Sequence, residues 1–142
     1  MKLAVDSSSF AKRYIQEIGS NKLDDLLQHA SVLALSVILV PEIISALNRR
    51  LREHALTEKD YRQAKRQLLH DVRDATILQV TPAVVVRSVK LLENNLLRAM
   101  DALHIACALE WKADLFITSD KRQLDAAIIS GLKTEYVGQL NP

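Results

Sequence analysis

The chain has 142 residues, of which 49% are hydrophobic and 25% charged, and its formal net charge is +2. This composition is typical of a folded globular protein and excludes a disordered chain, while the length fits a single domain that spans residues 1–142. The net charge is too small to indicate a nucleic-acid partner, and an aromatic share of 4% argues against a base-stacking sheet.

Strand and helix signals alternate along the chain. Short apolar, β-prone runs predict strands at residues 3–5, 32–35, 76–80, 115–118 and 134–137. Helical periodicity and capping residues predict helices at residues 10–18, 20–29, 41–51, 57–74, 82–92, 99–109 and 121–129. The alternation predicts an α/β fold of three layers, in which helices cover both faces of a mainly parallel sheet of about five strands.

Local residues account for several of the predicted helix ends. Gly19 stops the first helix, Ser20 can cap the second, and Pro41 suits the first position of the third. Thr57 followed by Asp60 resembles a capping box with Asp in place of Glu. These residues favour a helix end through their backbone or side chain, so they set the expected boundaries.

The sequence contains no signal for export or for a membrane. Its single cysteine, Cys107, cannot form a disulfide within the chain, which suits a reducing cytoplasm. Asp6 interrupts the apolar run at the N-terminus, so the apolar segment of a signal peptide is missing. The most apolar run, residues 32–40, is far shorter than the roughly 20 residues that span a bilayer. We therefore expect a cytoplasmic protein with no membrane contact.

Four acidic residues are expected at the carboxyl edge of the sheet, where parallel sheets bind ligands. Asp6 and Asp120 follow the first and fourth predicted strands, and Glu42 begins the helix after the second. Asp101 lies in the first turns of the helix at residues 99–109, which is apolar almost all round and therefore buried. Each acid could be an ordinary helix cap or first-turn acid. Together, however, four carboxylates repel each other, and an all-oxygen set suits Mg²⁺ or Mn²⁺ rather than zinc.

Polar residues beside these acids are candidates for a supporting role. Ser7, Thr118 and Ser119 carry hydroxyls that could hold water or phosphate oxygens, although turns and caps use the same residues. His104 lies one turn after the acid of the apolar helix, and we interpret it as a core histidine with satisfied hydrogen bonds rather than a metal ligand.

Four segments resemble the PIN-domain family, and most of all its VapC-type toxins of toxin–antitoxin pairs: LAVDSSSFAKRY, PEIISAL, RAMDALHIA and ITSDKRQL. The resemblance covers essentially the whole chain, in the same order and spacing. It implies an endoribonuclease dependent on Mg²⁺ or Mn²⁺ that leaves a 5′-phosphate and a 3′-hydroxyl. The catalytic and metal-binding acids would be Asp6, Glu42, Asp101 and Asp120. This chain departs from the family at Leu39, where members often carry Thr or Ser.

The sequence is compatible with functions of other classes. A phosphorylated receiver domain shares the alternating pattern, but it usually has two adjacent acids after the first strand and a lysine after a late strand. Here Val5 precedes Asp6, and Ser119 separates Thr118 from Asp120. The chain could also be a non-catalytic module that binds RNA or protein, or a stand-alone RNA-processing nuclease.

Basic residues predict where RNA would be held. Residues 49–67 carry seven arginines and lysines, which would contact phosphates without sequence preference, unless they are simply the solvated faces of two helices. Further basic residues flank the acids. The predicted RNA contacts are Lys12, Arg13, Arg49, Arg50, Lys121 and Arg122.

The first two predicted helices carry more apolar side chains than one sheet face needs. These side chains are Phe10, Tyr14, Ile15, Ile18, Leu23, Leu26 and Leu27. Spare apolar area marks a partner site, and the family resemblance implies a homodimer that binds an antitoxin. A groove between helices would accept an amphipathic segment, whose arginine could pair with the acids. The alternative is that these side chains pack into the core.

Overall fold

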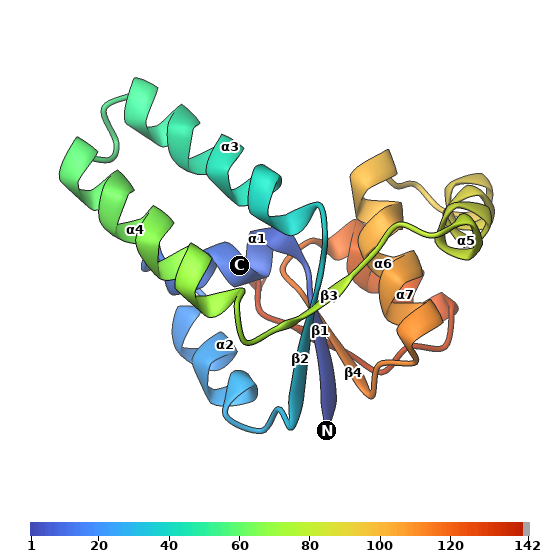
Figure 1. Ribbon diagram of the computed structural model, residues 1–142. Helices are drawn as coiled ribbons and strands as arrows, with labels where there is room; N and C mark the ends of the chain where they lie inside the picture. The colour runs from blue at the N-terminus through green and yellow to red at the C-terminus, as the bar shows by residue number, and fades with distance from the viewer. Residues whose placement is uncertain (141–142) are drawn as a thin grey trace.

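The computed structural model describes residues 1–140, and within them the strands form one five-stranded sheet in the order β3-β2-β1-β4-β5 (Figure 1). Each strand pairs in parallel with its neighbours. The strands are β1 (Lys2–Val5), β2 (Val32–Ser36), β3 (Thr76–Leu78), β4 (Leu115–Thr118) and β5 (Thr134–Tyr136). The predicted α/β architecture is confirmed, although β3 and β5 end earlier than predicted.

Helices cover both faces of this sheet and complete three layers (Figure 1). They are α1 (Ser7–Phe10), the 3-10 helix η1 (Ala11–Arg13), α2 (Ser20–Leu27), α3 (Leu39–Arg52), α4 (Glu58–Asp71), α5 (Pro82–Asn94), α6 (Ala99–Trp111) and α7 (Lys121–Ile129). The side chains of β1 alternate between the faces: Leu3 and Val5 pack with α1 to α4, whereas Ala4 packs with α5 to α7. None of the helices in residues 1–140 has the length and apolarity needed to span a membrane.

The strand order reverses between β1 and β4. From β1 the chain continues to β2 and β3 on one side, whereas β5 lies beyond β4 on the other. In open parallel sheets, ligands bind in the crevice at such a switch point. Asp6 follows β1 and Asp120 follows β4, so both acids lie at this crevice. Receiver domains have the strand order 2-1-3-4-5, and the alternative of a receiver domain is therefore wrong.

The prediction of a helix over residues 10–18 is wrong. Helical structure begins earlier, at Ser7, and ends at Arg13. Contacts of the following segment explain the difference, because Lys12 Nζ donates to the carbonyl of Ile18 at 2.7 Å and to Glu17 Oε1 at 3.0 Å. These bonds hold residues 14–18 as an irregular loop against η1, and local helix propensity is overridden.

Two other helix starts differ from the predictions. Gly19, with φ of +94°, is the N-cap of α2, and Ser20 is the first residue of that helix. Ser20 Oγ donates to the carbonyl of Lys12 at 2.9 Å and thus joins α2 to η1. The third helix begins at Leu39 rather than Pro41. A proline is tolerated there because N–H groups of the first helical turn have no intrahelical partner.

Candidate active site

Asp6 is a completely buried carboxylate at the crevice, with an exposed fraction of 0%. It is the N-cap of α1: Oδ1 accepts a hydrogen bond from the backbone N–H of Ser9 at 2.9 Å. Oδ2 accepts from Thr118 Oγ1 at 2.8 Å and from Ser8 Oγ at 3.1 Å. Burial raises the pKa of Asp6 against the opposing effects of His104 and of the hydrogen bonds from Ser9 and Thr118. A buried carboxylate is costly in free energy, and these hydrogen bonds offset only part of that cost.

The hydroxyls predicted to support the acids connect them to one another. Thr118 Oγ1, which donates to Asp6, also accepts from the backbone N–H of Asp120 at 3.1 Å. Ser119 Oγ lies 2.9 Å from Ser8 Oγ. The ends of β1 and β4 are therefore tied together by side chains at the switch point.

Asp120 and Asp101 face the same crevice from α7 and α6. Asp120 is the N-cap of α7, and its Oδ1 accepts from the backbone N–H groups of Arg122 at 2.8 Å and Gln123 at 3.1 Å. Asp101 is held on both oxygens: Gln123 Nε2 donates to Oδ1 at 3.0 Å and Arg98 Nε donates to Oδ2 at 3.2 Å. The cap interpretation of Asp6 and Asp120 is thus confirmed, and it coexists with their place in one crevice.

Glu42 reaches the crevice from α3 and is fixed by two neighbours. Its Oε1 accepts from Ser7 Oγ at 2.6 Å and lies 2.6 Å from His104 Nε2. Burial raises the pKa of Glu42, but hydrogen bonds from His104 and Ser7 outweigh burial and hold the pKa below its usual value. Both Ser7 and Glu42 meet the same ring nitrogen, Nε2. A serine–histidine–acid relay needs the two different nitrogens, so this trio is not a nucleophilic triad.

These side chains surround a cleft of about 90 Å³. Its lining residues are Ser7, Ser8, Glu42, Arg98, Asp101, His104, Asp120 and Gln123. Asp6 lies buried next to the cleft and contacts it through Ser8.

A divalent cation fits the chemistry of this cleft. Three carboxylates and two serine hydroxyls face it, which is the all-oxygen donor set that Mg²⁺ and Mn²⁺ prefer. Gln123 Oε1 is buried and has no hydrogen-bond partner within residues 1–140, so one further oxygen donor is unused. The acids are not drawn together, however: no group of three or more His, Cys, Asp or Glu side chains in the described part of the chain is close enough to hold a metal ion.

Comparison with known proteins identifies the family. Residues 3–129 match the PIN domain. The chain belongs to the PIN-domain family. A curated relative, Ribonuclease VapC45 of Mycobacterium tuberculosis (strain CDC 1551 / Oshkosh), is 30% identical over 104 residues, which cover 73% of this chain and 72% of VapC45.

Solved structures share this PIN-domain fold. VapC20 of Mycobacterium tuberculosis, described as a sarcin-ricin loop cleaving toxin, aligns with a TM-score of 0.68 at 16% identity, over 87% of this chain and 94% of that one. A chain of a toxin–antitoxin complex from Klebsiella pneumoniae aligns with a TM-score of 0.64 at 15% identity, over 86% and 89% of the two chains. At these identities the likeness establishes the fold alone.

The basic residues of this PIN domain are unequally placed for RNA. Arg49 and Arg52 line a second hollow of about 540 Å³ along α3, which we call the α3 groove. Its other lining residues are Ile38, Pro41, Glu42, Ser45, Ala46, Arg98 and Met100. Glu42 and Arg98 also line the acid cleft, so the two hollows adjoin. Lys121 and Arg122 are exposed directly beside Asp120.

Three predicted RNA contacts have other partners. Lys12 is buried, and its ammonium group is bonded to Glu17 and to the carbonyl of Ile18. Arg50 Nη2 lies 3.7 Å from Glu17, and Arg13 Nη1 lies 3.6 Å from Asp71. The ammonium of Lys12 is thus committed to structure, and the two arginines are paired with acids away from the cleft.

Sequence reasoning missed three residues of the cleft: Arg98, Gln123 and Ser8. Two of them carried a signal. Arg98 stands at a helix start, where an arginine is unusual, and Gln123 has capping-box spacing from Asp120. His104 is buried and satisfied as predicted, but its partner Glu42 places it in the site.

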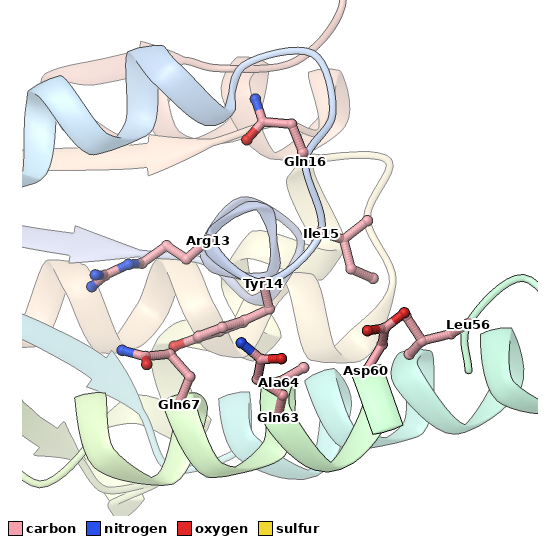
Figure 2. Close-up of a pocket in the computed structure, with 9 residues that line it drawn as sticks. All are labelled: Arg13, Tyr14, Ile15, Gln16, Leu56, Asp60, Gln63, Ala64 and Gln67. Carbon is pink, nitrogen blue, oxygen red and sulfur yellow. The ribbon is translucent and has the colours of Figure 1, made fainter. Parts of the chain in front are cut away.

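The apolar residues of the first two predicted helices mostly pack into the core. Phe10 and Leu23 are completely buried, whereas Ile18 remains 59% exposed. Between the loop that follows η1 and helix α4 lies a groove of about 540 Å³, which we call the α4 groove (Figure 2). Its lining residues are Arg13, Tyr14, Ile15, Gln16, Leu56, Asp60, Gln63, Ala64 and Gln67.

Proposed function

We propose that this chain is an endoribonuclease that depends on Mg²⁺ or Mn²⁺ and acts as the toxin of a toxin–antitoxin pair. The observation that supports it most directly is the oxygen-lined cleft at the switch point, which Glu42, Asp101 and Asp120 all line. Membership of the PIN-domain family and the ribonuclease name of VapC45 agree with this chemistry.

The acids would hold the cation, and the remaining residues would hold the acids. Asp101 and Asp120 would be direct ligands with Glu42, and Asp6 would complete the set from its buried position. A bound divalent cation would lower the pKa of a water molecule and stabilise charge on the phosphoryl oxygens. Gln123 would orient Asp101 through its hydrogen bond to Oδ1.

The hydrogen bonds of Glu42 would orient its carboxylate to bind a metal ion or a water molecule. Ser7 and His104 both bind Oε1 and thereby fix that oxygen, so Oε2 would be the oxygen of Glu42 that binds water or metal. Hydrogen bonds of this kind orient a ligand and are costly to remove. Thr118 plays the same part for Asp6.

The RNA backbone would follow the α3 groove to the acid cleft. Arg49 and Arg52 would contact phosphates on one side of the scissile bond, and Lys121 and Arg122 would contact them on the other. Such contacts give affinity that falls with salt and carry little base preference.

The function is tested by incubating purified, antitoxin-free protein with total RNA, with and without Mn²⁺, and by mapping the cut ends. Cleavage that requires Mn²⁺ and leaves 5′-phosphates is expected, and Asp101→Asn is the matched inactive control. Metal-dependent cleavage lost in that variant supports the proposal. RNA binding without any cleavage would favour the non-catalytic module instead.

The antitoxin is proposed to dock in the α4 groove (Figure 2). Figure 2 shows Tyr14 and Ile15 on the loop side of this groove, facing Gln63 and Ala64 of α4. Mixed apolar and polar lining of this kind suits an amphipathic segment. The solved toxin–antitoxin complex from Klebsiella pneumoniae, which shares this fold, supports a protein partner of that class.

A homodimer is proposed as well, with its contact on α5 rather than on the first two helices. The exposed apolar side chains Val85, Val86, Val89 and Leu92 form a stripe along α5. Their spacing places Val85, Val89 and Leu92 on one helix face. Light scattering at tens of micromolar tests the dimer, and Val89→Asp is expected to give a monomer.

A further inference from the structure

Arg98 breaks a local rule of helix formation at the edge of the acid cleft. It occupies the N-cap position of α6, where Ser, Thr, Asp and Asn are preferred because their oxygens accept hydrogen bonds from the first N–H groups. An arginine side chain cannot accept such a bond, and its charge is unfavourable at the positive end of a helix. Natural proteins break local rules of this kind mainly at functional sites. Helix stability therefore does not explain Arg98.

Arg98 is paired with one acid of the cleft, Asp101, and is close enough to two others to feel their charge. Arg98 Nε lies 3.2 Å from Asp101 Oδ2, and the arginine side chain is 77% exposed. The hydrogen bond to Asp101, together with the negative charges of Asp101, Asp120 and Glu42, raises the pKa of Arg98. An ion pair this exposed adds little stability, so the guanidinium can leave Asp101 at small cost.

Arg98 also lines the α3 groove, where Arg49 and Arg52 are expected to hold RNA phosphates. The same side chain therefore borders the metal-binding residues and the proposed path of the RNA. The planar guanidinium of Arg98 fits two kinds of partner equally well. One is the carboxylate of Asp101, and the other would be a phosphate of RNA bound in the α3 groove.

We propose that Arg98 exchanges partners: it neutralises Asp101 in the metal-free protein and binds an RNA phosphate in the α3 groove when a divalent cation is bound in the cleft. This inference rests on the proposed function. A divalent cation bound to Asp101 repels the guanidinium of Arg98. The best remaining partner of that guanidinium is then an RNA phosphate in the α3 groove. Because coupling between two ligands is reciprocal, Arg98 makes metal binding strengthen RNA binding, and RNA binding strengthen metal binding.

A purely structural arginine would behave in the opposite way. If Arg98 only oriented Asp101, its removal would leave that carboxylate misplaced and weaken metal binding. Exchange instead predicts that removing Arg98 relieves competition for Asp101. The sign of the change in metal affinity therefore separates the two roles.

Titration calorimetry with MnCl₂, without RNA, measures this sign. Arg98→Met is expected to bind Mn²⁺ about fivefold more tightly than the wild type, the size of an exposed ion pair, and Arg98→Lys is expected to remain near the wild type. Arg87→Met is the matched control, because Arg87 Nε of α5 pairs with Glu110 Oε1 at 2.8 Å at the C-terminal end of α6, away from the acid cleft. Unchanged or weaker Mn²⁺ binding by Arg98→Met would overturn the proposal.

Fluorescence anisotropy with a labelled single-stranded oligoribonucleotide measures how much Arg98 contributes to RNA affinity with and without a divalent cation. In Ca²⁺, which takes oxygen ligands, Arg98→Met is expected to lose about tenfold in RNA affinity, as for a charged hydrogen bond. In EDTA the loss should shrink to about twofold, because Arg98 must then give up its roughly fivefold pairing with Asp101 to bind the phosphate. Equal losses in both conditions would overturn the exchange. If the wild type binds Mn²⁺ and cleaves RNA but one of these two experiments gives the contradicting result, the exchange is wrong and the nuclease function stands. If the wild type neither binds Mn²⁺ nor cleaves RNA, the exchange and the nuclease function are both wrong.

Discussion

Nε2 of His104 lies 2.6 Å from Oε1 of Glu42, and the histidine is almost completely buried. The two residues come from α6 and α3, on opposite faces of the sheet, and they meet only at its carboxyl edge. This contact fixes Glu42, the proposed metal ligand on α3. It makes His104 a positioning residue for Glu42.

Replacement of His104 is expected to reduce catalysis more than substrate binding. His104→Ala should lower kcat for RNA cleavage about ten- to hundredfold, because loss of a residue that orients a ligand has effects of this size. KM for RNA should change little, and His104→Gln should recover part of the activity because its amide can still donate to Glu42. Cys107→Ala removes buried volume from the same helix and is the control. Full activity of His104→Ala would show that Glu42 needs no partner on α6.

Asp6→Asn is expected to abolish cleavage while it stabilises the metal-free fold. Burial raises the pKa of Asp6, so its ionised form costs free energy in the folded protein. Asparagine keeps the N-cap bond from Ser9 and removes the charge, which should raise the Tm in EDTA by about 2–4 °C if roughly 1 kcal/mol is recovered. Asp6→Ala lacks the cap and should not be stabilised. A lower Tm for Asp6→Asn would show that the carboxylate is well compensated without metal.

The same raised pKa predicts how this stabilisation depends on pH. The folded protein holds the Asp6 proton more tightly than the unfolded chain, whose value is 3.8. The contribution of Asp6 to the free energy of unfolding therefore falls as the pH rises from 3.8 through the higher pKa of Asp6 in the folded protein. The Tm difference between Asp6→Asn and the wild type should be near zero at the acid end of this range and largest at neutral pH. Melts in EDTA across that range measure it, and a constant difference would contradict the assignment to Asp6.

The sequence alone was sufficient to predict the layers and the position of the acids at the carboxyl edge of the sheet, and insufficient to predict the contacts between elements. The strand at residues 115–118 and the helix start at Thr57 depend on residues that are neighbours in the sequence, and both were predicted correctly. The loop after Arg13 was not, because the long-range bonds of Lys12 decide it. The partner of His104, Glu42, also lies on an element that only the fold brings near it.

Divalent cation is expected to stabilise the protein. A ligand that binds only the folded state adds RT ln(1 + [L]/Kd), about 2.7 kcal/mol at a hundred times Kd. Thermal melts in millimolar MnCl₂ should therefore lie several degrees above melts in EDTA, and Asp101→Asn should lose most of the shift because Asp101 lines the cleft. An unchanged Tm in wild-type protein would count against a metal site at these acids.

Arg49 and Arg52 should contribute to RNA affinity, whereas Arg50 should not. The first two line the α3 groove, and Arg50 is paired with Glu17. Each of Arg49→Gln and Arg52→Gln should weaken binding of a single-stranded oligoribonucleotide and flatten the plot of log K against log salt by about 0.7. Arg50→Gln is the matched control on the same helix. If Arg50→Gln weakened binding as much as the others, the RNA would follow a different path.

A bulky residue in the α4 groove should block the antitoxin and spare the nuclease. Gln63 is exposed on α4 and lines this groove, so Gln63→Trp would fill it without disturbing the core (Figure 2). Lys65 lies two positions further along α4 and therefore on another face, and Lys65→Trp is the matched control. When the neighbouring reading frame is co-expressed, its product should co-purify with the wild type and with Lys65→Trp, and be lost from Gln63→Trp. Mn²⁺-dependent RNA cleavage by purified Gln63→Trp should equal that of the free wild type. Partner binding that survives Gln63→Trp would move the docking surface elsewhere, and a product that never co-purifies would leave a stand-alone RNA-processing nuclease.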